Sequence, residues 1–470
     1  MTLKNYIILI TLYTIFGLIS IFFEIRELSN KKRIEIMDFF RFFYLFFYCI
    51  VPICYITAIK TGSYLELRAY EWMETNSLIF KYIIFIIHVT IYIGINFFYN
   101  LLNKNRKIEK KEKNEIDINK SYFYISNLII MTIGWIALVI YTRAYGSIFG
   151  IFDYAPLIRD NIFIIENKFT FMQPITMFLI ISSLNYVVLL KNMNNKSTKY
   201  KSATIILALI SFFGLFVVLE SIDSRTKILS LVLMIAFLLF SKKIFNINKK
   251  TIIILIAFVI VFMVLMANAD NITNLFRKNG TENLNISTVN ILDFINSNFG
   301  FVYVNNLNVL DRIINQKNLQ IRIGENIKGI TVSLLPRSIK EKVYTNMHVY
   351  NTSFSEKERG VIPSDLMTSS IYSMGYLGPI IFSVWIAIIL YLLNMIFERY
   401  KQLNDFYILL KGYIGFDICM SLVSFYDISS IIFSCFELIV GIIIIIIFKV
   451  IAMKAPKLNK CIERIYRIFS

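Results

Sequence analysis

Long apolar runs dominate the distribution of apolar and polar residues along this chain. A bilayer core of about 30 Å requires roughly 20 apolar residues in a helix, and eleven runs approach or reach that length. They cover 4–23, 39–59, 78–102, 122–142, 171–190, 203–221, 223–240, 251–268, 369–397, 405–425 and 428–450. One polar stretch, 269–368, separates the eighth run from the ninth. The pattern predicts an all-α polytopic integral membrane protein with about 11 (10–14) transmembrane helices and one large loop.

A β-barrel does not fit these runs, because each is continuously apolar and does not alternate with a period of two. Composition agrees with helices in a membrane: 57% of the residues are hydrophobic, and the mean hydropathy is +0.64. The first run could be confused with a secretory signal, but charged residues follow it where a small-residue cleavage site would stand. We therefore expect 4–23 to be a membrane helix.

Positive charge is concentrated in alternate short loops. The formal net charge of +18 could suggest nucleic acid, but lysine and arginine gather between apolar runs, which predicts no nucleic-acid partner. These basic clusters lie at 26–33, 104–120, 191–201, 242–250, 399–401 and 454–467. By the positive-inside rule they are cytoplasmic, so the N-terminus and the polar segment 269–368 are expected outside.

This topology divides the chain into three parts. Residues 1–268 would form membrane helices one to eight, and residues 269–368 an external loop that caps a site. Residues 369–470 would form helices nine to eleven and a basic cytoplasmic tail. A simple channel or flippase would rarely need so large a loop, so the pattern favours an enzyme embedded in a bilayer.

Few residues suggest metal or cofactor chemistry. None of the five cysteines lies in 269–368, and the two histidines are His88 and His348. We find no zinc-ligand spacing, phosphate-binding loop or dinucleotide fingerprint. The sequence therefore predicts neither a metal nor a cofactor. His88 is alone on an apolar run, where a hydrogen-bonded core histidine is the expected role.

The first group of candidate residues lies at the turn 220–227, Glu-Ser-Ile-Asp-Ser-Arg-Thr-Lys. Arg225 and Lys227 open a helix, where cations oppose the helix dipole and need an anionic partner. A lipid diphosphate would suit the arginine fork and the free N–H groups of the helix start. A surface ion-pair cluster with Glu220 or Asp223 explains these residues equally well.

The polar segment carries the second group. Basic residues outside the membrane run against the usual bias, which favours an anionic substrate. A solvated face explains most of these charges, and we expect two or three of them to be ligands. The candidates are Arg277, Arg312, Arg322, Arg337 and His348. Apolar residues at helical spacing over 291–314 predict a helix that lies partly on the membrane.

Three short motifs near the end of the polar segment carry a resemblance. They are Leu-Leu-Pro-Arg-Ser-Ile at 334–339, Gly-Val-Ile-Pro-Ser-Asp at 360–365 and Ser-Ile-Tyr-Ser-Met-Gly-Tyr-Leu-Gly-Pro at 370–379. Together with the Ser-Arg-Thr-Lys turn they resemble the O-antigen polymerase family, the oligosaccharide repeat-unit polymerases of the Wzy type. The likeness covers the topology of the whole chain, but distinct residues only near 220–230 and 330–380. The family commonly has an acidic residue just before the tyrosine, where this chain has Ser369 and Ser370.

The resemblance implies a GT-C-like, metal-independent inverting glycosyltransferase in the bacterial inner membrane. On the outer face it would polymerise undecaprenyl-diphosphate-linked oligosaccharide repeat units into O-antigen or capsule. Its partners would be these lipid-linked oligosaccharides, membrane lipids, a chain-length regulator and a flippase. An O-antigen ligase acting on lipid A-core and a lipid-linked glycan flippase or transporter stay open as alternatives. An enzyme that uses a lipid-linked monosaccharide phosphate fits less well, because 60–77 lacks an Asp-x-Asp pair.

The implied reaction must neutralise a diphosphate leaving group and deprotonate an acceptor hydroxyl. We expect Arg225, Arg337 and Tyr372 to line one cavity, and His348, Asp223 and Asp365 are weak candidates for the base. The expected catalytic residues are Arg225, Arg337, His348 and Asp223. The expected substrate-binding residues are Lys227, Tyr372, Arg312, Arg322 and Arg277.

Three acidic residues lie near the last two helices. Asp417 and Glu437 each stand ten residues from Asp427, which puts them roughly 15 Å from the last external turn. Charged groups at that depth are costly and often functional, unless they pair with a buried lysine or tyrosine. We expect structural or channel roles for them. Gly375 and Gly378 are expected to permit close helix packing.

Overall fold

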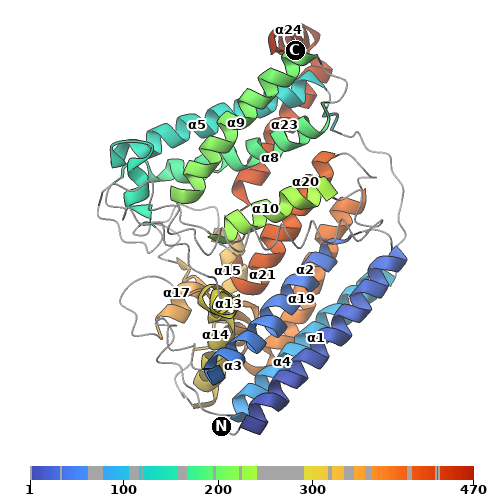
Figure 1. The fold of residues 1–470 in the computed structure, drawn as a ribbon, viewed down its shortest axis with the longest axis vertical. Helices are drawn as coiled ribbons and strands as arrows, with labels where there is room; N and C mark the ends of the chain where they lie inside the picture. Colours follow the sequence, from blue (N-terminus) through green and yellow to red (C-terminus); the bar gives the residue numbers. More distant parts are fainter. Residues whose placement is uncertain are drawn as a thin grey trace.

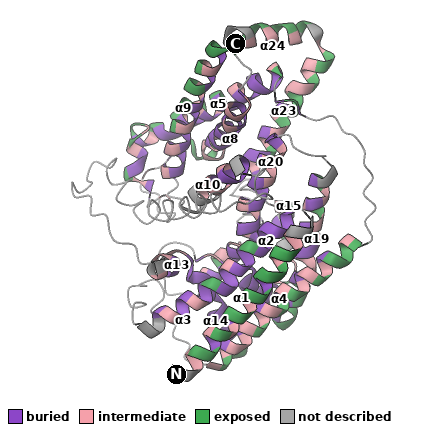
Figure 2. Ribbon diagram, turned by 45° about the vertical axis from the view of Figure 1, so that its right-hand side comes forward, coloured by how far each residue is buried: buried purple, intermediate pink, exposed green. Residues whose placement is uncertain are grey.

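The protein is an all-α, multi-pass membrane protein. The computed structural model describes residues 3–31, 34–61, 78–104, 116–118, 120–155, 158, 165, 167–193, 197–221, 225–240, 291–315, 320–332, 343–354, 362–399, 405–428, 431 and 435–469. Within these residues no strand is present, and nine helices are long and apolar enough to cross a membrane. Their outer faces carry many exposed isoleucine, leucine and phenylalanine side chains, which suit contact with lipid (Figure 2).

Nine of the eleven predicted apolar runs correspond to these membrane helices. The predicted run 223–240 is helix α10 (Arg225–Phe240), which has 16 residues. The run 251–268 lies outside the described residues, as does the beginning of the polar segment, 269–290. The structure therefore supports the predicted class of fold without fixing the number of helices.

The N-terminal part of the chain packs against a late helix. Helix α4 (Leu78–Lys104) lies beside α19 (Gly378–Arg399), and α1 (Leu3–Lys31) lies beside α4, in the lower half of Figure 1. Close packing of α4 on α19 depends on Gly94, because a Cβ there would stand 2.9 Å from the Cβ of Ser383. Residues far apart in sequence thus share one helical layer.

Two membrane segments contain a π-helical turn, an irregularity that often accompanies functional positions. The first consists of α2 (Ile36–Leu45), η1 (Phe46–Ile50) and α3 (Val51–Thr61). The second consists of α20 (Asp405–Tyr413), η8 (Ile414–Ile418) and α21 (Cys419–Ser424). These two segments contact each other. Their π-turns contain Tyr48 and Asp417, both of which make polar contacts inside the protein.

A second group of helices forms the upper half of Figure 1. Its long members are α5 (Ser121–Thr142), α8 (Phe178–Lys191), α9 (Thr198–Ser221) and α23 (Phe436–Lys454). Short helices complete it: η3 (Arg143–Tyr145), η4 (Gly150–Asp153), η5 (Thr170–Met172) and α7 (Gln173–Thr176). The tail predicted only as basic forms a further helix, α24 (Pro456–Phe469).

The described polar segment is also helical. It contains α13 (Ile291–Phe299), α14 (Phe301–Asn315), α15 (Glu325–Val332) and α17 (Met347–Thr352). The helix predicted over 291–314 is confirmed, apart from a break at Gly300. That part of this segment lies on the membrane stays a prediction; α14 itself is buried against α3, α4 and α18 (Leu366–Met374). Asparagines of α14 find partners within the protein, which permits this burial.

The ninth predicted run, 369–397, is broken near its start. Helix α18 ends at Met374, the short helix η7 (Gly375–Leu377) follows, and α19 then begins. Gly375 has a φ of +62°, which favours glycine. A Cβ on Gly378 would lie 2.0 Å from the carbonyl oxygen of Ser370. Close packing was expected of both glycines. It applies to Gly378, whereas backbone conformation is the stronger reason for Gly375.

Candidate functional site

Arg312 lies at the centre of a polar cluster where the polar segment meets the membrane helices. Helix α14 places its side chain between α17 and α18, with 5% of the residue exposed. Nη1 donates hydrogen bonds to the hydroxyl of Tyr372 and to Oδ1 of Asn351, the latter at 3.1 Å. The guanidinium also lies over the ring of Phe354, 4.6 Å from its centroid. Every one of these partners is formally neutral.

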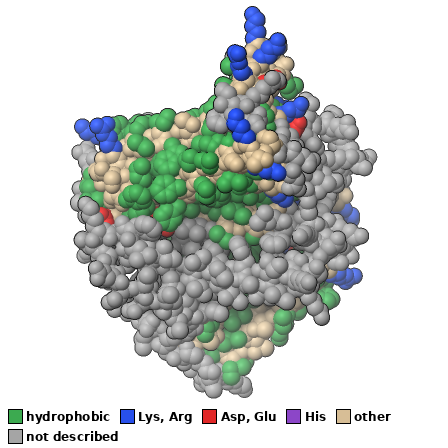
Figure 3. Space-filling view, turned by 45° about the horizontal axis from the view of Figure 1, so that its top comes forward, with side chains coloured by type: hydrophobic (Ala, Val, Ile, Leu, Met, Phe, Trp, Pro, Cys, Tyr) green, Lys and Arg blue, Asp and Glu red, His purple; other side chains and the backbone are tan. Residues whose placement is uncertain are grey.

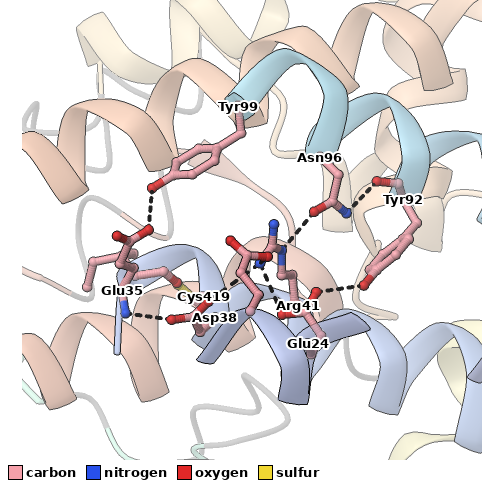
Figure 4. Close-up of polar contacts among 10 residues, drawn as sticks. Glu24, Glu35, Asp38, Arg41, Tyr92, Asn96, Tyr99 and Cys419 are labelled. Atoms are coloured by element: carbon pink, nitrogen blue, oxygen red, sulfur yellow. Dashed lines mark hydrogen bonds and ion pairs between the residues drawn. The ribbon is translucent and has the colours of Figure 1, made fainter. Parts of the chain in front are cut away.

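A second buried arginine, Arg41, has carboxylates beside it that balance its charge. Arg41 of α2 is 2% exposed, and its Nη1 lies 3.0 Å from Glu24, 2.6 Å from Glu27 and 3.5 Å from Asp38 (Figure 4). Its Nε donates to Asn96 at 2.7 Å.

Arg312 has no such compensation, because no carboxylate lies within ion-pair distance of it among the described residues. A buried cation without a counter-charge is costly. An anionic ligand would supply the missing charge.

Aromatic rings connect Arg312 to a second arginine. Tyr372 stacks on Phe354 with centroids 5.8 Å apart, and it meets Tyr350 edge-to-face at 5.1 Å. The Arg322 guanidinium lies over Tyr350, 4.8 Å from the ring centroid. Three of the residues predicted to bind substrate, Arg312, Arg322 and Tyr372, thus come together in one cluster.

The positive charge of Arg322 is partly neutralised, but not all of its N–H groups have hydrogen-bond partners among the described residues. Its Nη2 lies 3.2 Å from Oε1 of Glu325, and Lys328 lies 3.4 Å from the same oxygen. Within the described structure, Nε of Arg322 and Oε2 of Glu325 are buried and have no hydrogen-bond partner. The backbone N–H of Arg322 donates to the carbonyl of Tyr372 at 2.9 Å, which fixes this loop against α18.

His348 is half-buried beside this cluster, and one of its ring nitrogens is engaged. The backbone N–H of Ser364 donates to Nδ1 at 2.9 Å, so Nδ1 presents a lone pair and the proton of the neutral ring is on Nε2. Burial lowers the pKa of His348 below its ordinary value, although nearby Asp427 raises it. The ring is therefore neutral at pH 7, and its Nε2–H can donate a hydrogen bond.

Asp427 anchors the helix that carries His348. At the turn after α21 it accepts hydrogen bonds from the hydroxyl of Tyr344 and, at 3.0 Å, from Nδ2 of Asn346. Asn346 is in turn the N-cap of α17 and accepts from the backbone N–H of His348 at 2.7 Å. The acid that was predicted at the last external turn thus connects that turn to the polar segment.

Asp365 caps α18 and is fully buried. Its Oδ2 accepts from the hydroxyl of Tyr48 at 2.7 Å and from the backbone N–H groups of Met367 and Thr368. In the described structure its Oδ1 has no hydrogen-bond partner. Burial raises the pKa of Asp365 to about 6, against the lowering effect of hydrogen bonds from Thr368 and Tyr48. A capping role is therefore established, and a role as base stays a prediction.

His88 is a hydrogen-bonded core histidine, as predicted. It is fully buried, with Nδ1 3.1 Å from the hydroxyl of Tyr13 and Nε2 3.1 Å from Nδ2 of Asn306. Asn306 also accepts a hydrogen bond from the hydroxyl of Thr368 at 3.2 Å. This chain of contacts ties α1 and α4 to α14 and α18 beneath the arginine cluster.

Lys227 belongs to a different cluster. Its Nζ lies 2.9 Å from Oδ2 of Asp417 and 3.8 Å from Oε1 of Glu437, and Tyr413 donates to Glu437 at 2.5 Å. Asp417 and Glu437 thus pair with a lysine and a tyrosine, which agrees with the structural role expected for them. Lys227 pairs with buried acids of other helices, whereas the surface ion-pair interpretation named the acids of its own turn. We therefore do not include Lys227 in the anion site.

Four candidates have no described side chain. Asp223, Arg277 and Arg337 lie outside the described residues. Arg225 begins α10, but its side chain is not among those described. The single cavity expected to join Arg225, Arg337 and Tyr372 therefore stays a prediction.

The sequence alone did not identify the uncharged residues of the cluster. Asn351, Phe354 and Tyr350 orient the two arginines, yet none belongs to a motif that was singled out. The one signal was compositional: 301–315 contains asparagines between apolar residues, which is unusual for a solvated helix. Buried asparagines need partners, and such a pattern indicates a polar network inside the protein.

Comparison with known proteins adds no relative. No family model, curated protein or solved structure matches the chain.

Proposed function

We propose that this protein is a membrane-embedded, metal-independent glycosyltransferase that polymerises undecaprenyl-diphosphate-linked repeat units on the outer face of the inner membrane. The observation that carries the proposal is the Arg312 cluster. A buried guanidinium with neutral partners, next to aromatic rings and at the start of a membrane span, suits a ligand that combines an anionic diphosphate, a sugar and a lipid. The sequence resemblance to repeat-unit polymerases points to the same substrate.

The proposed reaction assigns tasks to the arginines. The acceptor hydroxyl oxygen attacks the anomeric carbon of the donor sugar, and the bond from that carbon to the diphosphate oxygen breaks. Negative charge that develops on the leaving diphosphate is stabilised by Arg312, with Arg322 at the edge of the cluster.

The acceptor proton needs a base. The Nε2–H of His348 suits a hydrogen bond to a substrate oxygen, whereas its Nδ1 lone pair is occupied by Ser364. Asp365 is the candidate that we prefer, because a pKa of about 6 leaves it mostly deprotonated at pH 7 and its Oδ1 has no partner in the described structure.

The test is extension of a purified lipid-linked repeat unit by the purified protein. We expect a ladder of longer lipid-linked products. Arg312→Ala should lower the rate about 100-fold or more, because one preorganised charge-stabilising donor is worth that much. Arg312→Lys should restore only part of it, since lysine lacks the planar fork. Arg143→Ala, at an exposed arginine of η3, is the matched control and should leave the rate unchanged.

The same assay separates the alternatives. An unchanged rate in Arg312→Ala would remove Arg312 from the reaction. Transfer to a lipid A-core acceptor without extension of repeat units would indicate a ligase. Movement of the lipid-linked unit between leaflets without a new glycosidic bond would indicate a flippase.

A further inference from the structure

The C-terminal helix α24 lies across the end of the second helix group. Helix α23 ends at Lys454, and Figure 2 shows α24 turning across the ends of α5 and α9 without continuing the direction of α23. The ring of Tyr466 lies 5.5 Å from that of Tyr124 and 5.7 Å from that of Tyr200. Ile462 is buried on the same side. These contacts give α24 a fixed orientation.

The opposite side of α24 carries Lys457, Lys460 and Arg464, which together with Lys454 at the end of α23 we define as the basic stripe. All four residues are exposed, and the three on α24 are spaced three or four residues apart, so these three share one face of that helix. None of them has an ion-pair partner among the described residues. Glu463, the nearest acid in sequence, accepts a hydrogen bond from Asn459 at 3.2 Å. The stripe is thus an uncompensated positive surface.

The stripe begins where a membrane helix ends. Helix α23 is one of the nine candidate membrane spans found among the described residues, and Lys454 is its last residue. Exposed apolar residues, Met453 and Ile465, flank the basic ones. Figure 3 shows lysine and arginine side chains projecting from the upper end of the molecule, above a broad hydrophobic face. The basic stripe therefore lies at the level where lipid headgroups begin.

We propose that the basic stripe of α24 is a binding site for anionic phospholipid headgroups. Phosphate groups at the membrane surface supply the counter-charge that the protein lacks, and Met453 and Ile465 contact the adjoining acyl region. An acidic protein partner could pair with the same cations. The position of the stripe at the end of a membrane span and its apolar flanks favour lipid. This inference is independent of the proposed reaction.

The test counts bound lipid by native mass spectrometry of the full-length protein in neutral detergent, with added phosphatidylglycerol or phosphatidylcholine. We expect phosphatidylglycerol to bind preferentially and to dissociate as ionic strength rises. The double variant Lys460→Gln/Arg464→Gln should lose affinity about thirtyfold, because each basic residue near an anionic surface contributes about 1 kcal/mol. Arg143→Gln/Lys168→Gln, which removes two exposed cations elsewhere, is the matched control and should bind as the wild type does.

An independent readout uses Cys461, which lies next to the stripe and is exposed, whereas the other four cysteines are buried. An environment-sensitive dye on Cys461 should shift its emission when phosphatidylglycerol is added, and not with phosphatidylcholine. Equal phosphatidylglycerol binding by the wild type and the α24 double variant would overturn the proposal. Equal binding of phosphatidylglycerol and phosphatidylcholine by the wild type would also overturn it. Either result would leave an acidic protein surface as the candidate partner.

Discussion

At the scale of single residues, two buried arginines have different surroundings. Arg41 is surrounded by three carboxylates and joins α1, α2 and α4, whereas Arg312 is held only by neutral groups among the described residues. Sequence reasoning selected Arg312 and Arg322 from among many basic residues of the polar segment. It could not rank them, because the difference lies in contacts with Asn351 and Phe354 that no sequence spacing reveals.

Asp365 provides a residue-scale prediction about pH. Because its pKa is raised to about 6, the folded protein keeps a proton that the unfolded chain releases near pH 4. The free energy of unfolding should therefore fall as pH rises from about 4 to about 6, by at most about 3 kcal/mol from this group. Asp365→Asn keeps a capping oxygen and stays neutral, so it should flatten that fall. The thermal unfolding midpoint measured across this pH range checks the prediction.

The control for this prediction is Asp153→Asn, at an exposed acid of η4, which should keep the wild-type pH profile. An Asp365→Asn profile that matches the wild type would contradict the argument. Activity measured on the same variant addresses a separate question: loss of activity with stability retained would point to Asp365 as the base.

At the scale of elements, the hydrophobic runs predicted most helices. They did not predict the π-turn, the late start of α23 or the helix α24. The run 39–59 corresponds to a helix with a π-turn at Phe46–Ile50, and the run 428–450 begins later, at Phe436. Helix α24 was missed because lysine, arginine and asparagine residues separate its apolar positions, although these positions recur at helical spacing. The π-turn at Phe46–Ile50 contains Tyr48, whose partner Asp365 lies 317 residues away in sequence, so no local pattern reveals this contact.

The break between α18 and α19 gives an element-scale prediction. Gly378→Ala should lower the thermal unfolding midpoint strongly, because its Cβ would collide with the backbone of Ser370 in α18. Gly375→Ala should have a smaller effect, since it adds a conformational cost of about 1–3 kcal/mol and a contact of 3.2 Å with Ile321. Gly146→Ala is the matched control, because its φ is +85° and nothing lies within 4 Å of its Cβ. Equal effects at Gly378 and Gly146 would show that the α18–α19 contact is looser than described.

At the scale of the whole molecule, the two ends of the helix bundle differ in chemistry. The arginine cluster, α17 and the Asp427 turn lie at one end, and the basic stripe of α24 follows the opposite end of α23. Loop charge predicts that the polar segment is outside and the basic tail inside. The sequence alone was enough for this prediction of sidedness, whereas the contacts that form the site needed the structure.

Native cysteines allow this sidedness to be tested with little change to the protein. Cys461 is exposed on α24 and the other four cysteines are buried, so a membrane-impermeant maleimide should label the wild type only after cells are permeabilised. Lys328→Cys in a Cys461→Ser background should be labelled in intact cells, because the Lys328 side chain is 58% exposed on α15 of the polar segment. Labelling of Cys461 from outside, or of Lys328→Cys only after permeabilisation, would invert the topology. The proposed reaction would then face the wrong side, since lipid-linked repeat units are joined outside the cytoplasmic membrane.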